Sequence, residues 1–266
     1  MRAMILAAGL GTRLRPLTDT IPKALVELEG RTLLEITLAR LKSFNITEII
    51  VNTHHHGAKI QSYLQAKNNF GLSITISQED ELLDTGGGLR KASWFFLEDK
   101  SRLDEPFVLH NVDILTDIDL NAMRQFHQLQ SAAATLAVQS RDTSRPLLFA
   151  PSLQLAGRRN GRNAPVELVP PAPLSRATTS VRLAAGKTAE VPALDSLAFC
   201  GIHLISPRLL PQISETGIFS VIPTYLRLAA TQKILAFRAD HYYWRDLGRP
   251  ADLVQAAGDL QQNLVR

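Results

Sequence analysis

Cysteine is almost missing from this sequence, since Cys200 is the only one among 266 residues, and no internal disulfide can form. No apolar run is long enough to cross a bilayer, and we expect no signal peptide in the N-terminal MRAMILAAGL. These shortages exclude a disulfide-stapled secreted fold and a membrane-spanning one. We therefore expect a cytoplasmic protein without a membrane partner, in which Cys200 is a small buried apolar residue.

The net charge of +4 comes from one stretch of the chain. Residues 141–190 carry eight basic and three acidic side chains, a surplus of five, which leaves −1 for the remainder. Phe149 is the only aromatic residue in that stretch, whereas segments that bind nucleic acid interleave basic and aromatic residues. We expect no nucleic-acid partner, and we interpret the stretch as a solvated flap or as a lid over an anionic substrate.

Short apolar runs alternate with stretches of helical spacing, such as the apolar face at Leu34, Leu38 and Leu41. The predicted strands span 1–8, 47–52, 72–78, 106–113, 133–140, 196–205, 233–239 and 242–247. The predicted helices span 33–44, 57–66, 87–98, 120–131, 219–231 and 250–264. This alternation predicts an α/β fold with a Rossmann-like, mainly parallel mixed sheet and helices on both faces.

The alternation stops in residues 151–195, which contain RRNGRN and VPPAP and predict irregular chain or a β-ribbon. We expect one domain over 1–266, with 141–195 as an insertion within it. Ligands of parallel sheets bind beyond the carboxyl ends of the strands. The loops at 9–22, 79–87 and 111–117 are therefore expected to converge.

A loop rich in glycine and basic residues follows the first predicted strand, in LAAGLGTRLRPLTDTIPKAL (6–25). Its glycines let backbone N–H groups approach a bulky anion, and its basic side chains supply charge, so the ligand is expected to be rich in phosphate. The Walker motif is absent. A dinucleotide fingerprint also fails, because Leu14 stands where a small residue is needed and Asn52 where an acidic one is needed.

The loop resembles the G-x-G-T-R-x(n)-P-K signature of the sugar-phosphate nucleotidyltransferases, also called nucleoside-diphosphate-sugar pyrophosphorylases. The matching positions are Gly9, Gly11, Thr12, Arg13, Pro22 and Lys23. The resemblance continues, in the family's order, through DTGGGLRKA (84–92), LHNVDIL (109–115), AFCGIHLI (198–205) and YWRDLGRPADL (243–253). The chain length resembles the short members, such as mannose-1-phosphate guanylyltransferases and N-acetylmuramate-1-phosphate uridylyltransferase.

The resemblance implies transfer of a nucleoside monophosphate from a nucleoside triphosphate to a sugar 1-phosphate, with release of pyrophosphate. The attacking phosphate oxygen is already an anion, so the reaction needs cations rather than a general base. Arg13 would neutralise the β- and γ-phosphates, and Lys23 would stabilise charge at the α-phosphate. Asp113 and Asp246 would hold one Mg²⁺, a hard cation that takes oxygen ligands.

Both carboxylates have alternative roles. Asp113 could cap the helix that follows it, and Asp246 could pair with a neighbouring arginine in a turn. The competitors are Asp117 and Asp119 for the metal, and Arg245 and Arg249 for the ion pair.

The resemblance also implies a nucleotide side and a sugar side. The nucleotide contacts are expected from Leu6, Ala7, Ala8, Gly9, Gly11, Thr12, Gln78, Thr85, Gly86 and Gly87. Gln78 would face the base or lie on the surface, and Thr85 could also be the N-cap of a helix. Cys200 and Gly201 would lie on the sugar side.

The chain departs from the family's pattern at three points. Val112 replaces the common Gly before the metal aspartate, Cys200 replaces an Asn or Ser, and no E-K-P element is evident within 141–195. The last departure suggests that the arginine-rich segment grips the acceptor phosphate differently, through Arg176 or Arg182.

Three further stretches favour structural roles. The triplet His54-His55-His56 lacks ligand spacing and favours a loop, Trp94, Phe95 and Phe96 favour the core, and residues 218–228 are either core or an interface. A monomer and a homodimer both stay open.

Two other functions stay open as well. The first is a catalytically silent nucleotide or sugar-phosphate sensor, which would not need a pair of metal ligands. The second is another transferase of this fold, such as a phosphocholine cytidylyltransferase or a molybdopterin-type nucleotidyltransferase. A choline site needs an aromatic cage, and the three ligand loops contain no aromatic residue.

Overall fold

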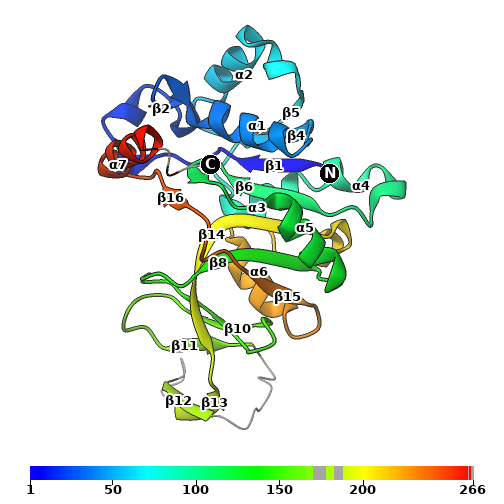
Figure 1. Cartoon of the computed structure of the whole chain (residues 1–266). Coiled ribbons are helices and arrows are strands. Elements are labelled where there is room, and N and C mark those ends of the chain that lie inside the picture. The colour runs from blue at the N-terminus through cyan, green and yellow to red at the C-terminus, as the bar shows by residue number, and fades with distance from the viewer. Residues whose placement is uncertain (170–177, 183–187, 263, 265–266) are drawn as a thin grey trace.

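The computed structural model of the chain describes residues 1–169, 178–182, 188–262 and 264, with the backbone alone for 178–182 and 188–192. Ten strands form one mixed sheet (Figure 1). They are β1 (Ala3–Leu6), β4 (Glu48–Thr53), β5 (Ser73–Gln78), β6 (Phe107–Asn111), β8 (Ala134–Gln139), β9 (Leu147–Phe149), β10 (Leu155–Arg159), β11 (Val166–Leu168), β14 (Asp195–Ile205) and β15 (Ile234–Arg238). The order is β11-β10-β9-β14-β6-β1-β4-β5, with β8 paired to β14 and β15.

The strands β1, β4, β5 and β6 are parallel, and β14 runs antiparallel to β6 and β8. In β1 the neighbouring side chains of Met4 and Ile5 point to opposite faces and are both fully buried. Strands buried on both faces need continuous apolar runs, which is the pattern seen in the sequence. The predicted mainly parallel α/β sheet is confirmed.

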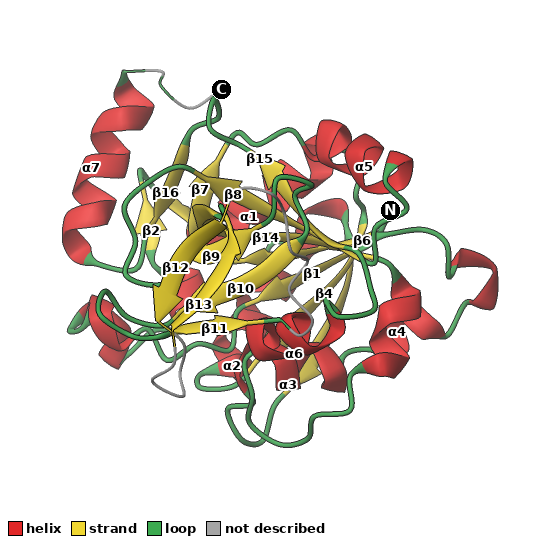
Figure 2. Ribbon diagram, turned by 90° about the horizontal axis from the view of Figure 1, so that it is seen from below, coloured by secondary structure: helices red, strands yellow, loops and turns green. Residues whose placement is uncertain are grey.

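Helices cover both faces of the sheet (Figure 2). They are α1 (Leu33–Ser43), α2 (Gly57–Ala66), α3 (Asp84–Lys91), α4 (Trp94–Leu97), α5 (Leu120–Leu129), α6 (Val221–Leu228) and α7 (Pro250–Gln261). Leu38 of α1 packs with Ile5 in one apolar cluster. Leu89 of α3 and Tyr225 of α6 pack with Met4 in a second cluster on the other face.

Side-chain caps fix where two helices begin. Thr32 Oγ1 accepts a hydrogen bond of 3.1 Å from the Glu35 N–H at the start of α1. Asp119 accepts hydrogen bonds from the Asn121 and Ala122 N–H groups at the start of α5. Capping satisfies N–H groups that have no partner within the helix. Both helices consequently begin within one residue of the predicted positions.

The prediction of one helix over 87–98 is wrong. The chain forms α3 and α4, separated at Ala92 and Ser93. The single turn of α4 places Phe96 in the core, stacked on Phe107 with ring centroids 3.7 Å apart. Residues two apart on a helix do not face the same side, so Trp94 points outward and is 49% exposed. The prediction that Trp94 belongs to the core is therefore wrong.

The insertion contains a β-ribbon, which is one of the two structures predicted for residues 151–195. The strands β9, β10 and β11 extend the main sheet beyond β14. A separate hairpin of β12 (Thr178–Arg182) and β13 (Thr188–Pro192) lies past them in Figure 1. Arg176 falls outside the described residues, and Arg182 lies in β12 with no described side chain.

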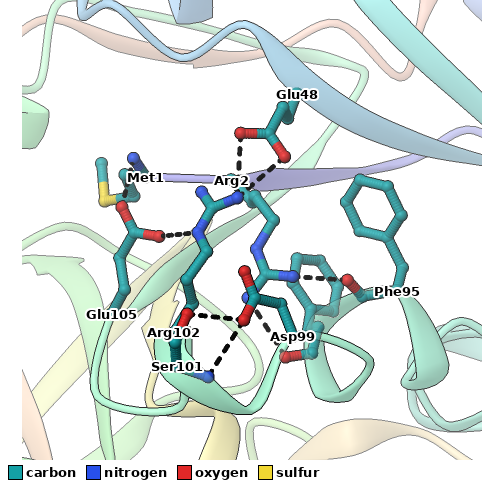
Figure 3. Close-up of polar contacts among 9 residues, drawn as sticks. Met1, Arg2, Glu48, Phe95, Asp99, Ser101, Arg102 and Glu105 are labelled. Carbon is teal, nitrogen blue, oxygen red and sulfur yellow. Dashed lines mark hydrogen bonds and ion pairs between the residues drawn. The ribbon is translucent and has the colours of Figure 1, made fainter.

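Ion pairs close the end of the sheet where β1 begins (Figure 3). Arg102 contacts Glu48 at 2.9 Å and Glu105 at 2.7 Å. The Arg2 guanidinium donates to the Phe95 carbonyl at 2.6 Å. These contacts leave the opposite end, at the carboxyl ends of the parallel strands, for a ligand. Among the described residues, no helix has the length and apolar content needed to cross a membrane.

Candidate active site

A cavity of about 360 Å³ opens at the carboxyl ends of β1 and β6. Its walls are Leu6, Ala7, Ala8, Gly9, Lys23, Asn52, Leu82, Asp84, Thr85, Asn111, Val112, Asp113 and Ile218. These residues come from all three loops that were expected to meet, so the predicted convergence is confirmed. Ile218, which is 67% exposed, lies at this cavity, whereas Val221 and Tyr225 further along the same stretch belong to the core.

The two glycines of the first loop have different roles. Gly9 lines the cavity, and a Cβ added there would meet nothing within 4 Å. Gly11 does not line the cavity. It has φ +65°, and a Cβ there would lie 2.8 Å from Thr18 Cγ2. Gly11 is therefore required by the turn that leads into Thr12 and Arg13, rather than by a ligand at its own position.

Lys23 forms an ion pair with Asp113 across the cavity. The two side chains are only 12% and 14% exposed. Lys23 follows the extended Pro22, and Asp113 follows β6 in the turn before β7 (Ile114–Thr116). The sequence places these residues in separate motifs, and the fold brings their charged atoms into direct contact.

Asp246 lies beside Asp113 because two short strands pair. The strand β16 (Trp244–Asp246) runs antiparallel to β7, with Asp246 opposite Ile114. The Leu247 N–H donates to the Asp113 carbonyl at 2.8 Å. Burial raises the pKa of the Asp246 carboxyl, and the nearby negative charge of Asp113 raises it further. Two carboxylates therefore meet in a partly desolvated place.

Arg13 completes the charged group. Its Nη2 lies 3.8 Å from Asp246 Oδ2. The other oxygen of this carboxylate, Oδ1, accepts a hydrogen bond of 2.7 Å from the Gly248 N–H. The structure thus brings together the four predicted residues Arg13, Lys23, Asp113 and Asp246, in two ion pairs.

The competing roles fall to other residues. Asp119 caps α5, and Asp117 Oδ1 accepts a hydrogen bond of 2.7 Å from the Tyr243 N–H. Arg245 pairs with Asp259 at 2.6 Å instead of Asp246. Of the carboxylates weighed for the metal, Asp113 lines the cavity and Asp246 lies beside it, whereas Asp117 and Asp119 do not line it.

The described part of the chain holds no cluster of three or more His, Cys, Asp or Glu residues arranged as a metal site. His54 Nδ1 instead lies 3.0 Å from the Glu79 carbonyl, in agreement with a loop role for the histidine triplet. An all-protein cage is therefore absent from those residues. Two carboxylates suit a Mg²⁺ ion that takes its other ligands from water and phosphate.

Two buried polar residues that the sequence analysis did not predict hold the start of the glycine-rich loop in place. Asn52 Oδ1 accepts a hydrogen bond of 2.7 Å from the Ala7 N–H, and its Nδ2 donates to Glu79 Oε1 at 2.7 Å. Glu79 Oε2 also accepts from the Leu83 N–H at 3.0 Å. Asn52 is the last residue of the predicted strand TEIIVN, and a polar residue at that end of an apolar strand was the available signal.

Of the predicted nucleotide contacts Thr85, Gly86 and Gly87, only Thr85 lines the cavity. The N–H groups of Gly86 and Gly87 donate to the Phe219 carbonyl at 2.9 and 3.2 Å. The interpretation of Thr85 as an N-cap is wrong, because α3 begins at Asp84 and the Thr85 hydroxyl accepts from the Val221 N–H at 3.0 Å. The glycines allow α3 to lie close to this neighbouring segment, and their predicted contact with the nucleotide stays a prediction.

Gln78 does not line the cavity either. Its Oε1 accepts a hydrogen bond of 2.8 Å from the Thr53 hydroxyl. A contact between its amide and the base would need that bond to open, and the contact stays a prediction.

A second cavity of about 560 Å³ adjoins the first one, and Asp84, Thr85 and Asn111 line both. Its walls include Gly201, Phe199, Trp244, Asp246 and four arginines. Cys200 does not line it. Its thiol is fully buried with its pKa raised to about 12 by burial. Gly201 therefore lines the second cavity, whereas the thiol of Cys200 is buried as expected, and the place of both residues on the sugar side stays a prediction.

A model of the nucleotidyl transferase family matches residues 2–149 of the chain. An N-acetylmuramate alpha-1-phosphate uridylyltransferase of Caulobacter vibrioides is 28% identical over 98% of this chain and 97% of its own length. A second one, of Neisseria meningitidis, is 41% identical over 47% of this chain. A UTP–glucose-1-phosphate uridylyltransferase of Synechocystis is 34% identical over 53% of it. The matches span 52% and 37% of the lengths of these last two relatives.

Solved structures share the fold. HddC from Yersinia pseudotuberculosis, complexed with GMP-PN, superposes with a TM-score of 0.70, at 19% identity and over 97% of this chain and 99% of that one. A UDP-glucose pyrophosphorylase complexed with UDP-glucose also gives a TM-score of 0.70, at 16% identity and over 98% of each chain. Both comparisons support the Rossmann-like fold described above.

Proposed function

This chain belongs to the nucleotidyl transferase family, and from that premise we propose that it transfers a nucleoside monophosphate from a nucleoside triphosphate to a sugar 1-phosphate. The products are a nucleoside-diphosphate sugar and pyrophosphate. The observation that carries the proposal is a pair of ion pairs: Lys23 and Asp113 line the first cavity, and Asp246, which pairs with Arg13, lines the second. The names of the relatives support the class of reaction, since they all describe transfer onto a sugar 1-phosphate.

The two cavities suit the two substrates. The first, enclosed by the glycine loop, would take the nucleoside triphosphate, and the second would take the sugar 1-phosphate. Asn111 and Asp246 border the second cavity on the side of the ion pairs. The acceptor phosphate would therefore lie next to the α-phosphate, as an in-line transfer requires.

In this reaction an oxygen of the sugar phosphate forms a bond to the α-phosphorus. The bond between that phosphorus and the oxygen bridging to the β-phosphate breaks, and pyrophosphate leaves with the electron pair. No proton has to move, because the attacking oxygen is already ionised. The protein has to position several anions and stabilise the charge that develops between them.

Lys23 and Arg13 are the cations placed for that task. Lys23 lies on the wall of the nucleotide cavity, where it would contact the α-phosphate, and Arg13 would neutralise the leaving pyrophosphate. Both are held by a carboxylate in the free protein. The buried pair with Asp113 fixes the position of the long Lys23 side chain before a substrate arrives, which lowers the entropy that binding must remove.

Asp113 and Asp246 would hold a Mg²⁺ ion. The residues fit such an ion, because burial and the charge of Asp113 together raise the pKa of Asp246, and a divalent cation would relieve this repulsion. When bound, the metal supplies positive charge to phosphate oxygens.

The alternative of a phosphocholine transferase gains no support from the aromatic residues of the second cavity. The Trp244 ring is covered by the Arg141 guanidinium, with 3.6 Å between the guanidinium carbon and the ring centroid. A quaternary ammonium group would have to displace a cation that is already stacked on that face.

The test measures release of pyrophosphate by the purified protein in the presence of Mg²⁺. Each of ATP, CTP, GTP, UTP and dTTP is combined with the 1-phosphates of mannose, glucose, N-acetylglucosamine and N-acetylmuramate. Lys23→Met is expected to lower kcat by about 10²- to 10³-fold, as loss of a charge-stabilising group does. Asp113→Asn should lower the affinity for Mg²⁺, so that turnover needs a higher Mg²⁺ concentration.

Lys100→Met provides the matched control, because Lys100 is exposed at the opposite end of the sheet. It should retain full activity. Full activity in Lys23→Met would contradict the proposed role of Lys23. No release with any pair of substrates while nucleotide binding persists would contradict the proposed function and favour a sensor.

A further inference from the structure

A buried histidine that the proposed reaction does not use lies on the wall of the second cavity. His203 lines this cavity from β14, together with Phe199 and Gly201 of the same strand. His203 is only 1% exposed. A polar side chain that is buried so deeply needs hydrogen-bond partners for its ring nitrogens. The partners of His203 therefore show what the cavity offers to a ligand.

The imidazole of His203 is held on two sides. The hydroxyl of Tyr225, a fully buried residue of α6, lies 3.0 Å from His203 Nδ1. The ring of Phe199 packs against the imidazole in an edge-to-face arrangement, with 4.6 Å between the ring centroids. These two contacts fix the orientation of the imidazole before a ligand binds.

The contact with Tyr225 also determines which ring nitrogen carries the proton. Among the described residues, His203 Nδ1 is the only hydrogen-bond partner of the Tyr225 hydroxyl. A buried hydroxyl donates to the acceptor within its reach, so Nδ1 accepts and we assign the ring proton to Nε2. Burial lowers the pKa of His203 to about 3, which keeps the ring neutral near pH 7. His203 is therefore a neutral N–H donor at Nε2.

This donor lacks an acceptor within the described part of the chain. No residue described there forms a hydrogen bond with His203 Nε2, and this atom is not enclosed by protein atoms as His110 Nε2 is. A donor that is left unpaired in a nearly buried position is unfavourable. A ligand in the second cavity that offers an acceptor atom would complete the hydrogen bonding of His203.

His203 lies away from the atoms that react. Gly201 is close to them, because a Cβ on it would lie 3.0 Å from Asn111 Nδ2, and Asn111 lines both cavities. His203 pairs with Leu109, two residues back from the carboxyl end of β6, and two residues of a strand span about 7 Å. An acceptor whose phosphate lies beside Asp246 would therefore bring its sugar, and not its phosphate, to His203.

We propose that His203 Nε2 donates a hydrogen bond to an uncharged oxygen of the acceptor sugar, and thereby selects sugar 1-phosphates that carry an oxygen at that position. A neutral donor does not offset the charge of an anion, so an uncharged oxygen is its matching partner. The oxygen has two possible chemical sources, a hydroxyl group or the carbonyl of an acylamino group. The inference deepens the proposed function and rests on it.

The first test uses the unaltered protein and the 1-phosphate of mannose, glucose, N-acetylglucosamine or N-acetylmuramate that supports turnover. This parent acceptor is compared with its single-deoxy analogues, in each of which hydrogen replaces one hydroxyl or the acylamino group. We expect an analogue with kcat/KM lowered by about 10- to 100-fold, because it leaves the donor unpaired in the complex. The group removed in that analogue identifies the source of the oxygen.

His203→Asn tests whether this discrimination comes from His203. The short amide can still accept from Tyr225, but it does not reach the position of Nε2. KM for the parent acceptor should rise about 10-fold with kcat nearly unchanged, and the variant should no longer distinguish the parent from that analogue. His203→Gln has a longer amide that places an N–H near the position of Nε2, and it should retain the distinction.

His127→Gln is the matched control. His127 is also a buried histidine with hydroxyl partners, and it lines neither of the two cavities. Its substitution should leave kcat, KM and the distinction between parent and analogue unchanged.

Equal kcat/KM values for the parent and all its analogues would overturn the inference. So would a His203→Asn variant that still distinguishes every analogue, or a His203→Gln variant that loses the distinction as fully as His203→Asn. If no sugar phosphate releases pyrophosphate, the proposed function fails on its own. Calorimetric titration of the four sugar phosphates then decides. Weaker binding of one of them to His203→Asn but not to His203→Gln supports the hydrogen bond, and equal or absent binding refutes it.

Discussion

Acid should destabilise this protein through a histidine that has no part in the proposed reaction. His127 lies on α5 and is buried, with Nδ1 2.9 Å from Thr135 Oγ1 and Nε2 3.0 Å from Ser206 Oγ. Burial lowers its pKa from 6.5 to about 4. The folded protein therefore keeps this ring neutral at a pH where the unfolded chain protonates it.

The sign and size of the effect follow from the two pKa values. As the pH falls below 6.5, the unfolded state binds the proton and the folded state does not, so stability is lost until the pH approaches 4. Between about pH 7.5 and pH 5, this single group removes about 2 kcal/mol from the free energy of unfolding. For a chain of this length, that corresponds to a fall in Tm of about 3 to 4 °C.

His127→Gln isolates the contribution, because an amide offers hydrogen bonds to the same two hydroxyls and does not titrate. Urea unfolding, followed by circular dichroism at both pH values, should show the variant losing about 2 kcal/mol less than the unaltered protein. His110 and His203, whose pKa values burial also lowers, titrate in both proteins and cancel in this difference. Equal losses in the two proteins would refute the assignment of a neutral, buried His127.

Three further predictions concern stability, and each is measured by urea unfolding at neutral pH. Gly88→Ala would place a Cβ 2.6 Å from Glu79 Oε1, so it should lower the free energy of unfolding by about 1 to 3 kcal/mol, whereas Gly9→Ala should have little effect. Tyr225→Phe removes the hydroxyl 3.0 Å from His203 Nδ1 and leaves that buried nitrogen without its partner, so the free energy of unfolding should fall by a similar amount. An unchanged unfolding midpoint would contradict this. Arg102→Met should cost about 1 kcal/mol or less, because its ion pairs are partly exposed, and a loss of several kcal/mol would show that they are more than surface contacts.

The sequence determined the class of the fold because the signals for it are local. Runs such as TEIIVN show an apolar strand within a few residues, and the spacing of Leu34, Leu38 and Leu41 shows the buried face of a helix. The G-x-G-T-R and P-K elements lie within one loop, so their resemblance to a family is readable without knowledge of distant contacts. The same local reading misjudged Trp94, because the end of α3 depends on what packs against it.

The composition of the site depended on tertiary structure. Asp246 was predicted only through the resemblance of its segment to the family, and the pairing of β16 with β7 placed it beside Asp113. The role of Asn52 also depended on tertiary structure, because its hydrogen bonds to Ala7 and Glu79 join separate strands. Such contacts depend on which strands are neighbours in the sheet, and no periodicity in the chain records that.

The arginines of the second cavity show the same division. Their abundance within 141–190 is a fact of the sequence, and it left two interpretations, a solvated flap or a lid over an anionic substrate. The fold determined which of these arginines have partners within the protein. Glu167 pairs with Arg158 because β10 lies next to β11, and Trp244 of β16 stacks on Arg141. The composition determined that this part of the chain is positively charged. The register of the sheet determined where that charge faces a cavity, because only folding brings distant side chains within bonding distance.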